Sequence, residues 1–348
     1  MAAFDNPAFD NHERVLFCAD EASGLRAIIA IHSTALGPGA GGCRLWHYES
    51  DDAALTDVLR LSQCMSYKNA MAGLKFGGGK AVIIKTRDFS GSDALYEKFG
   101  EYVESLNGDY VTAEDVGMSV NIMQTIGRRT KHVSGLPQEA GRAGGDPSPK
   151  TSWGIFKGIE AAVRFKLGKD SVAGLTVAIQ GVGNVGYYLS KYLSSAGANL
   201  IVADIDESRV RRVCDEFGAS TAGLDDILFQ AVDVVAPCAL GAVLTEDSIP
   251  RLRTAIIAGG ANNQLVLAAD GQRLVDADIL YAPDYVINAG GIINVSCEYY
   301  GGVDDDEVLD LVTAIGPRLT QIFEAAAEIG KPTNEIADKQ AQDIIAAA

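Results

Sequence analysis

The 348-residue sequence has little of what metal sites and disulfide frameworks require. Its six cysteines include no Cys-x-x-Cys pair, none has a histidine at metal-ligand spacing, and the four histidines are dispersed. We therefore expect free thiols in a reducing compartment and no structural or catalytic metal. Lysines and carboxylates are left to carry any acid/base chemistry.

Positive charge is also scarce, since the formal net charge is -17. Nucleic acids and anionic membranes bind basic patches, so we expect neither as a partner. No apolar run has the length of a membrane helix, and the first residues lack the basic and then apolar layout of a signal peptide. The composition, 47% hydrophobic and 22% charged, predicts a globular cytoplasmic protein long enough for two domains.

One glycine-rich stretch, Gly77-Gly78-Gly79-Lys80, runs directly into an apolar, strand-like segment. A triple glycine lets a substrate or a second backbone come close, and the apolar segment would hold the Lys80 amine in a drier setting. Desolvation disfavours the ammonium form, so Lys80 is a candidate acid or base. From this stretch alone, a flexible turn with a solvated lysine is an equally open alternative. A Walker A loop is excluded because Leu74 and Ala81 stand where that loop needs Gly and Ser or Thr.

The first half otherwise alternates strands and helices. Residues 14–18 and 25–32 are predicted strands, residues 51–70 and 93–106 are predicted amphipathic helices, and residues 36–44 have too much glycine for a regular element. Lys68, near the end of the first helix, brings a positive charge toward the glycines or simply caps the helix.

Residues 110–117 are predicted to form a strand that ends in two adjacent carboxylates, Glu114 and Asp115. Neighbours on a strand face opposite ways, so only one of them can point into a given cleft. Ser119 is a candidate cap for the helix that follows.

The second half carries a dinucleotide-binding pattern. A glycine- and proline-rich linker over 137–149 is followed by a helix over 152–167, a strand over 175–180, and the sequence GVGNVG at 181–186. In this context Gly181 makes the tight turn, Gly183 lets the backbone approach a pyrophosphate, and Gly186 allows the helix to pack on the strand. Asp204 lies at the tip of the next strand, where a carboxylate binds ribose hydroxyls, so NAD is favoured over NADP.

Further strand-then-loop units follow near 232–239, 255–263 and 279–291, and their tips should line the cofactor cleft. Asn262 and Asn288 would there supply neutral donors and acceptors, or would simply form turns. We predict an α/β protein with a cleft between two domains, an N-terminal α/β substrate domain and a Rossmann-type doubly wound NAD-binding domain. The predicted ranges are 1–136 for the substrate and oligomerisation domain, 137–149 for the linker, 150–330 for the NAD-binding domain with a helix over 307–329, and 331–348 for a tail packing back on the first domain.

Together these parts predict a reaction class. Hydride transfer from a carbon that bears an amine needs a neutral amine, a pinned substrate carboxylate and an activated water. Lys68, Lys80 and Asp115 would suffice for these tasks.

From Val15 to about Ile329 the sequence resembles the amino-acid dehydrogenase family that includes glutamate, leucine, valine and phenylalanine dehydrogenases. The stretches that carry the resemblance are LGP at 36–38, GG at 41–42, Arg44, MSYKNA at 65–70, GGGK at 77–80, TAEDVG at 112–117, GVGNVG at 181–186, APCA at 236–239, GANNQ at 260–264 and YAPDYVINAGG at 281–291. The resemblance implies reversible NAD-dependent oxidative deamination of an L-amino acid to a 2-oxo acid and ammonia. It also implies a homo-oligomer that associates through the substrate domain.

The resemblance also assigns residues. It makes Lys80 the catalytic lysine, Asp115 the general acid/base and Lys68 the ligand of the substrate carboxylate. Main-chain contacts to substrate are implied at Gly42 and Met65, and contacts to the nicotinamide end at Thr151 and Asn262. The remaining cofactor contacts are implied at Arg44, Gly181, Gly183, Asn184, Val185, Gly186, Asp204, Ala239 and Asn288.

Substrate choice depends on Ala40, Ala113, Ile292 and Val295, the expected side-chain pocket. The glutamate branch carries a lysine where this chain has Ala40, so a buried second carboxylate would lack a partner. Alanine at position 113 is typical of the leucine and valine branch. Ala40 would widen the floor of the substrate pocket, whereas Ile292 would narrow one of its walls. We expect a branched-chain aliphatic substrate, with phenylalanine as the rival.

Two alternatives remain. A NAD-binding sensor without turnover would need Lys68, Lys80 or Asp115 to be lost, and all three are present. A 2-hydroxy-acid dehydrogenase would use a histidine in the cleft, but His47 and His132 lie at no strand tip or glycine loop.

Overall fold

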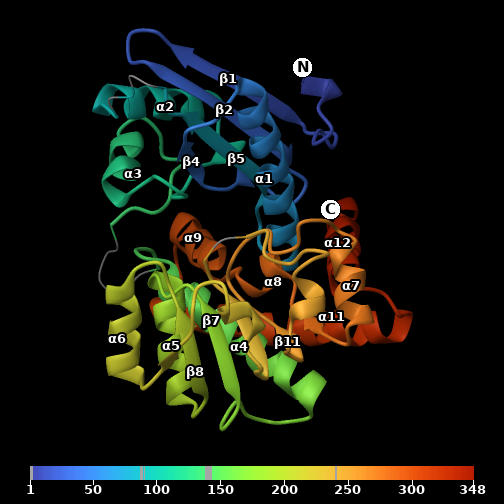
Figure 1. Cartoon of the computed structure of the whole chain (residues 1–348). Helices are drawn as coiled ribbons and strands as arrows, with labels where there is room; N and C mark the ends of the chain where they lie inside the picture. Colours follow the sequence, from blue (N-terminus) through green and yellow to red (C-terminus); the bar gives the residue numbers. More distant parts are fainter. Residues whose placement is uncertain (1–2, 87–88, 90, 138–142, 240) are drawn as a thin grey trace. The chain divides into compact units, whose positions relative to one another are not determined.

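The computed structural model describes residues 3–86, 89, 91–137, 143–239 and 241–348, which form two compact units (Figure 1). Unit 1 comprises Met1–Asp146, Asn294–Asp305 and Ala341–Ala348, and unit 2 comprises Pro147–Ile293 and Asp306–Gln340. The predicted α/β class and two-domain organisation are confirmed. The boundaries differ from the predicted ranges, since the segment 294–305 belongs to unit 1 and the tail is shared between the units.

Unit 1 is built on a mixed sheet in the order β1-β2-β5-β3-β6, in which β4 also pairs with β5. Its strands are β1 (Arg14–Asp20), β2 (Leu25–Ser33), β3 (Gly39–Ala40), β4 (Cys43–Trp46), β5 (Gly77–Ile84) and β6 (Tyr110–Val111). Its helices are η1 (Ala3–Asp5), α1 (Asp51–Met71), α2 (Asp93–Ser105) and α3 (Val120–Gly127). Helices α1, α2 and α3 begin after Ser50, Ser92 and Ser119, whose side chains accept a hydrogen bond from the backbone three residues on. The predicted cap at Ser119 is confirmed.

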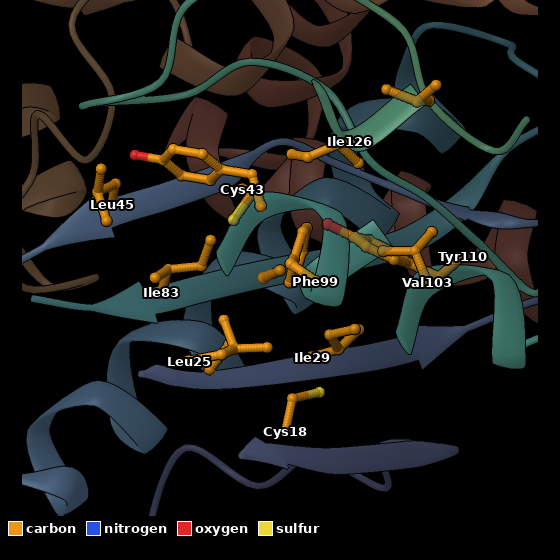
Figure 2. Close-up of a cluster of buried hydrophobic side chains, with 14 of the residues drawn as sticks. Cys18, Leu25, Ile29, Cys43, Leu45, Ile83, Phe99, Val103, Tyr110 and Ile126 are labelled. Carbon is orange, nitrogen blue, oxygen red and sulfur yellow. The ribbon is translucent and has the colours of Figure 1, made fainter. Parts of the chain in front are cut away.

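The sheet is covered on both faces, which explains the near-continuous apolar sequence of β2. On one face Ile29 packs in a core with Phe99 of α2 and Ile83 of β5 (Figure 2). On the other face Ile28 packs with Leu59 of α1. Strand β5 therefore lies in the interior of unit 1, where a charged side chain is largely shielded from water.

Residues 77–80 begin the regular strand β5, contrary to the flexible-turn alternative, whereas residues 36–44 form no continuous element and contain only the two-residue strand β3 and the start of β4. The glycines are needed because backbones approach closely. A Cβ on Gly41 would lie 1.9 Å from the carbonyl oxygen of Gly79, and one on Gly42 would lie 2.3 Å from that of Glu114. A Cβ on Gly78 would lie 1.9 Å from Ser66 Oγ, so this glycine lets helix α1 lie directly on β5.

Unit 2 is an open sheet in the order β12-β11-β10-β7-β8-β9, and all its paired strands are parallel. Its strands are β7 (Thr176–Gln180), β8 (Asn199–Ala203), β9 (Ser220–Thr221), β10 (Val234–Pro237), β11 (Ile256–Ile257) and β12 (Leu280–Tyr281). Its helices are α4 (Ser148–Leu167), α5 (Asn184–Ser195), α6 (Glu207–Phe217), η2 (Ile227–Phe229), η3 (Ile249–Arg251), α7 (Asp270–Asp276), α8 (Asp284–Ile287), α10 (Asp305–Thr313) and α11 (Ile315–Ile329). The chain proceeds from β7 outward to β9 and then returns to β10 on the other side of β7. This reversal marks the point where such sheets bind ligands.

Two predicted boundaries are corrected. Helix α4 begins at Ser148, inside the predicted linker, because Pro149 falls in the first helical turn, where a missing N–H costs nothing. The predicted helix over 307–329 is two helices, α10 and α11, since Pro317 is tolerated only in the first turn of a new helix. Residues 138–142 of the predicted linker lie outside the described residues.

Helices α9 (Gly290–Tyr300) and α12 (Thr333–Ala346) each continue from one unit into the other. At the end of α12, Gln342 donates a hydrogen bond of 2.9 Å to Tyr67 Oη on α1 within unit 1. In the part of the chain that the structure describes, no helix is long and apolar enough to cross a membrane.

We expect Gly78→Ala to destabilise the protein by about 3 kcal/mol, because the new methyl group would clash with backbone and side-chain atoms of Ser66. Urea unfolding measures the loss. Gly127→Ala is the matched control, since the nearest atom to its added Cβ is 3.5 Å away and the position is helical. Equal stability of the two variants would contradict the packing argument.

Candidate active site

The candidate site in unit 1 centres on Lys80 of β5 and Asp115, which follows β6. Lys80 is 7% exposed, and its Nζ contacts Asp115 Oδ2 directly. Asp115 Oδ1 accepts a 2.7 Å hydrogen bond from the backbone N–H of Val116. A buried amine and a carboxylate are thus joined at the edge of the glycine-rich strand.

Strand β4 brings these two groups together. Arg44 of β4 pairs in parallel register with Val82 of β5 on one side. On the other side, the N–H of Cys43 donates 2.8 Å to the carbonyl of Ala113, and the N–H of Leu45 donates 2.9 Å to that of Val116. Strand β4 therefore lies between β5, which carries Lys80, and the segment that carries Asp115.

The pKa of Asp115 is set by opposing effects. Burial raises this pKa, but the charges of Lys80 and Arg44 outweigh burial and lower it from 3.8 to about 2. Asp115 is accordingly a carboxylate near neutral pH when no substrate is bound. The adjacent Glu114 lies beside Gly135, since its Cγ is 3.1 Å from a Cβ built there, and burial together with Asp146 and Glu298 raises its pKa. The prediction that only one of the two adjacent acids joins Lys80 agrees with this geometry.

Other predicted substrate residues in unit 1 lie on the elements around Lys80. Lys68 is half-buried in the last turn of α1, and Met65 on the same helix lies 3.0 Å from the position of a Cβ built on Gly41. Ala113 is buried, and its carbonyl accepts the β4 hydrogen bond. Ala40 is buried in a small cluster with Phe76.

The candidate cofactor site in unit 2 is the loop between β7 and α5. Gly181 has φ +90°. A Cβ on Gly186 would lie 2.0 Å from the carbonyl oxygen of Gly181, so helix and strand meet closely there. A Cβ on Gly183 would meet only Arg209 Nη1, at 3.5 Å, so the space above this residue is open. No side chain caps the N-terminus of α5 at Gly183, which leaves the N–H groups of Asn184 and Val185 to an anion.

Asp204 follows β8 and braces this loop. Its Oδ2 accepts 2.8 Å from the N–H of Val182, and its Oδ1 accepts 2.9 Å from that of Asp206. Each carboxylate oxygen has a second lone pair for a ribose hydroxyl. These residues fit the pyrophosphate and ribose of a dinucleotide.

The remaining predicted cofactor residues of unit 2 lie at the same edge of its sheet. Asn288 Nδ2 donates 2.8 Å to Asn262 Oδ1 and 3.1 Å to the carbonyl of Gly260. A Cβ on Gly181 would lie 2.6 Å from that of Ala239, and one on Gly291 would lie 2.9 Å from Thr151 Oγ1. Neighbouring Ile292 on α9 is half-buried in unit 2, whereas Val295 on the same helix is half-buried in unit 1.

Among the described residues, no group of three or more His, Cys, Asp and Glu side chains could hold a metal ion. All six cysteines are free thiols.

Comparison with known proteins agrees with this geometry. The family model described as "Glu/Leu/Phe/Val dehydrogenase, dimerisation domain" matches residues 12–132, and "Glutamate/Leucine/Phenylalanine/Valine dehydrogenase" matches residues 146–220 and 202–342. The chain belongs to this amino-acid dehydrogenase family.

Individual relatives cover nearly the whole chain. Leucine dehydrogenase of Bacillus subtilis (strain 168) is 46% identical over 96% of this chain and 92% of its own. Phenylalanine dehydrogenase of Lysinibacillus sphaericus is 42% identical over 96% and 89%. The crystal structure of L-tryptophan dehydrogenase from Nostoc punctiforme is 42% identical, has a TM-score of 0.84, and is matched over 97% of this chain and 96% of that chain.

The predicted resemblance, closest to the leucine and valine branch of this dehydrogenase family, is confirmed. The sequence reasoning missed the surroundings of Arg44, which it assigned to the cofactor. Arg44 Nη1 lies 3.1 Å from Asp57 Oδ2, and its Nε lies 3.6 Å from Asp115 Oδ2. The one feature of the sequence that indicated a partner for Arg44 was the acidic residue Asp57 next to the apolar positions of α1.

The lowered pKa of Asp115 gives a linkage prediction for this dehydrogenase. A carboxyl whose folded pKa lies below its ordinary 3.8 contributes stability above about pH 4 and loses it as the pH falls toward 2. We expect Asp115→Asn to remove about 2 kcal/mol of pH-dependent stability between pH 5 and 2, measured by urea unfolding at several pH values. Asp51→Asn, which alters an exposed ion pair with Arg26, is the control and should leave that dependence unchanged.

Proposed function

We propose that this dehydrogenase catalyses the reversible NAD-dependent oxidative deamination of a branched-chain aliphatic L-amino acid to the 2-oxo acid, ammonia and NADH. Leucine, valine and isoleucine are the proposed substrates. The observation that carries this proposal is the direct contact between buried Lys80 and Asp115 in a chain of this family.

The chain's own residues would divide the work as follows. Lys68 would bind the substrate carboxylate, and the N–H groups around Gly42 and Met65 would orient the amino acid. Lys80 in its neutral form would take a proton from water as that water attacks the imine carbon. Asp115, which contacts Lys80, would pass protons to and from the departing amine.

NAD, when bound, would accept the hydride from the substrate Cα. The uncapped turn at Gly183 would hold its pyrophosphate, and Asp204 would accept hydrogen bonds from the adenosine ribose. A carboxylate at this position repels a 2'-phosphate, which favours NAD. Thr151, Asn262 and Asn288 would contact the nicotinamide end.

The residues around Ala40 support an aliphatic substrate. Ala40 packs with Phe76 and Val111, and Tyr299 packs against the same cluster. Phe76 is fully buried. A glutamate side chain placed among these apolar side chains would find no hydrogen-bond partner on them, so an aliphatic side chain is favoured.

We further propose a homo-oligomer that associates through the substrate domain, with small-molecule partners only and a cytoplasmic location. A sensor without turnover is disfavoured because Lys68, Lys80 and Asp115 are all retained.

Turnover tests the proposal directly. NADH formation at 340 nm, measured at alkaline pH with NAD and separately L-leucine, L-valine, L-phenylalanine and L-glutamate, should be fastest with the aliphatic pair. Lys80→Ala should reduce kcat by at least about 1000-fold and leave NADH binding, followed by fluorescence, intact. Deamination that persisted in this variant would show that another group is the base. No turnover of any amino acid by the wild type would favour the sensor.

The phenylalanine rival is tested by Phe76→Leu. Removing part of the ring beside Ala40 should raise kcat/KM for phenylalanine relative to leucine by about tenfold, because the pocket floor deepens. Phe99→Leu, a similar loss in the separate core of Figure 2, controls for the general effect of core truncation. An identical substrate ratio in both variants would exclude position 76 from the pocket.

A further inference from the structure

Arg44 lies between two carboxylates that come from different elements of unit 1. Its Nη1 lies 3.1 Å from Asp57 Oδ2 on α1, while its Nε faces Asp115 Oδ2 at 3.6 Å. The first distance is a hydrogen bond, and the second is too long to be one. The guanidinium is therefore attached to Asp57 and only stands beside Asp115.

Asp57 is itself fixed by a second donor. Tyr48 Oη donates 2.6 Å to the same Oδ2 that binds Arg44. Burial and the neighbouring Asp57 raise the pKa of Tyr48, so its hydroxyl keeps its proton and remains a donor. Tyr48 lies in the loop before α1, and Asp57 lies in the second turn of that helix. The two hydrogen bonds to Asp57, from Tyr48 and from Arg44, are called the brace here, and they tie β4 to α1.

The 3.6 Å separation between Arg44 Nε and Asp115 Oδ2 leaves a buried N–H without a hydrogen bond to this carboxylate. Arg44 Nε is buried, and among the described residues it has no hydrogen-bond partner. An unsatisfied buried donor is destabilising, and a small movement toward Asp115 would satisfy it. Asp57 and Tyr48 hold the guanidinium against that movement.

Asp115 is surrounded by groups from several strands. Lys80 of β5, Arg44 and Cys43 of β4, and Tyr110 of β6 all interact electrostatically with it, as does Tyr48. Burial raises the pKa of the Cys43 thiol and of the Tyr110 hydroxyl, so both stay neutral. Lys80 and Arg44 are thus the positive groups at Asp115, and Asp57 balances the second of them.

We propose that Tyr48 and Asp57 are positioning residues of this dehydrogenase, which restrain Arg44 so that Asp115 keeps its oxygen available to Lys80 and the reacting groups. The inference rests on the proposed role of Asp115. Without the brace, Arg44 would close onto Asp115 and tie up the carboxylate. In this arrangement the restrained position of Arg44 keeps the Asp115 carboxylate available, whether or not Arg44 also contacts the cofactor.

Three variants distinguish the hydrogen bonds that hold Arg44 from the negative charge of Asp57. Tyr48→Phe removes one hydrogen bond without changing charge, so kcat should fall about threefold to tenfold with no movement of the acidic limb of the pH profile. Asp57→Asn keeps an oxygen for Arg44 but loses the negative charge, so the limb should move to lower pH by about 0.5 unit with a modest loss of kcat. Asp57→Ala should show both effects, with at least a tenfold loss of kcat.

The sign of the pH shift follows from electrostatics. A negative charge beside the site helps its groups hold their protons, so removing that charge lets the catalytic group lose its proton at lower pH. Asp51→Asn makes the same charge change at the first residue of α1, where the partner is exposed Arg26, and should leave kcat and the acidic limb unchanged.

Steady-state kinetics from pH 6 to 11, thermal midpoints and NADH fluorescence titration measure all four variants. The proposal requires losses in kcat with the KM for the amino acid changed less than about threefold. It is overturned if Tyr48→Phe and Asp57→Ala match Asp51→Asn, or if activity falls only with the folded fraction while the pH profile is unchanged. It is also overturned if weaker NADH binding accounts for the whole loss.

These outcomes differ from failure of the proposed function. If the wild type deaminates no amino acid, the function itself fails before any variant is compared. If Asp115→Asn retains full kcat, the role of Asp115 fails. An active wild type with an impaired Asp115→Asn variant and normal Tyr48 and Asp57 variants rejects the brace alone.

Discussion

The burial of the Lys80 ammonium against Asp115 is the constraint on which the rest of unit 1 depends. Moving two charges out of water costs several kcal/mol for each, and their attraction repays this only when the geometry is fixed. Here β4 fixes it by pairing with Lys80's strand on one side and with the segment before Asp115 on the other. The close approach of these backbones requires glycine at positions 41 and 42, where any Cβ would overlap a neighbouring atom.

Because of this constraint, the residues around Gly42 affect both the stability of unit 1 and the geometry of its candidate active site. A larger residue at Gly42 would push the Asp115 segment away, because its Cβ would lie 2.9 Å from that of Asp115. The same change would open the strand pairing that shields Lys80. Glycine is usually costly in a strand because it packs poorly, but here its lack of a side chain is what allows the site to form.

Much of this structure could be predicted from local sequence signals. The buried strand β2, the serine-capped helices and the glycine turn after β7 each follow from a short pattern with a physical cause. Lys80 stood out because a lysine at the start of an apolar run is unusual. Asp115 was a candidate because it ends a predicted strand, but its contact with Lys80 could not be predicted, since no spacing along the chain shows that residues 80 and 115 meet.

Features that depend on tertiary packing could not be predicted. Glycine content argued against a regular element at residues 36–44, yet β3 and the start of β4 lie in that stretch because close backbone approach overrode local propensity there. The brace of Tyr48 and Asp57 spans a helix N-terminus and has no periodic signature. The return of residues 294–305 to unit 1 depends on α9 running from one unit into the other, which a linear domain boundary misses.

The charges around Asp115 also bear on substrate choice. Lys80 and Arg44 are balanced by Asp57 and Asp115, so these four groups carry no net charge and can be kept away from water, while the proposed role of Lys68 adds a positive charge for the substrate carboxylate. An apolar amino acid enters as a zwitterion and adds no net charge. Glutamate would add one negative charge, which the apolar side chains around Ala40 could not hydrogen-bond. Under the proposed function, this burial without a partner would disfavour acidic substrates.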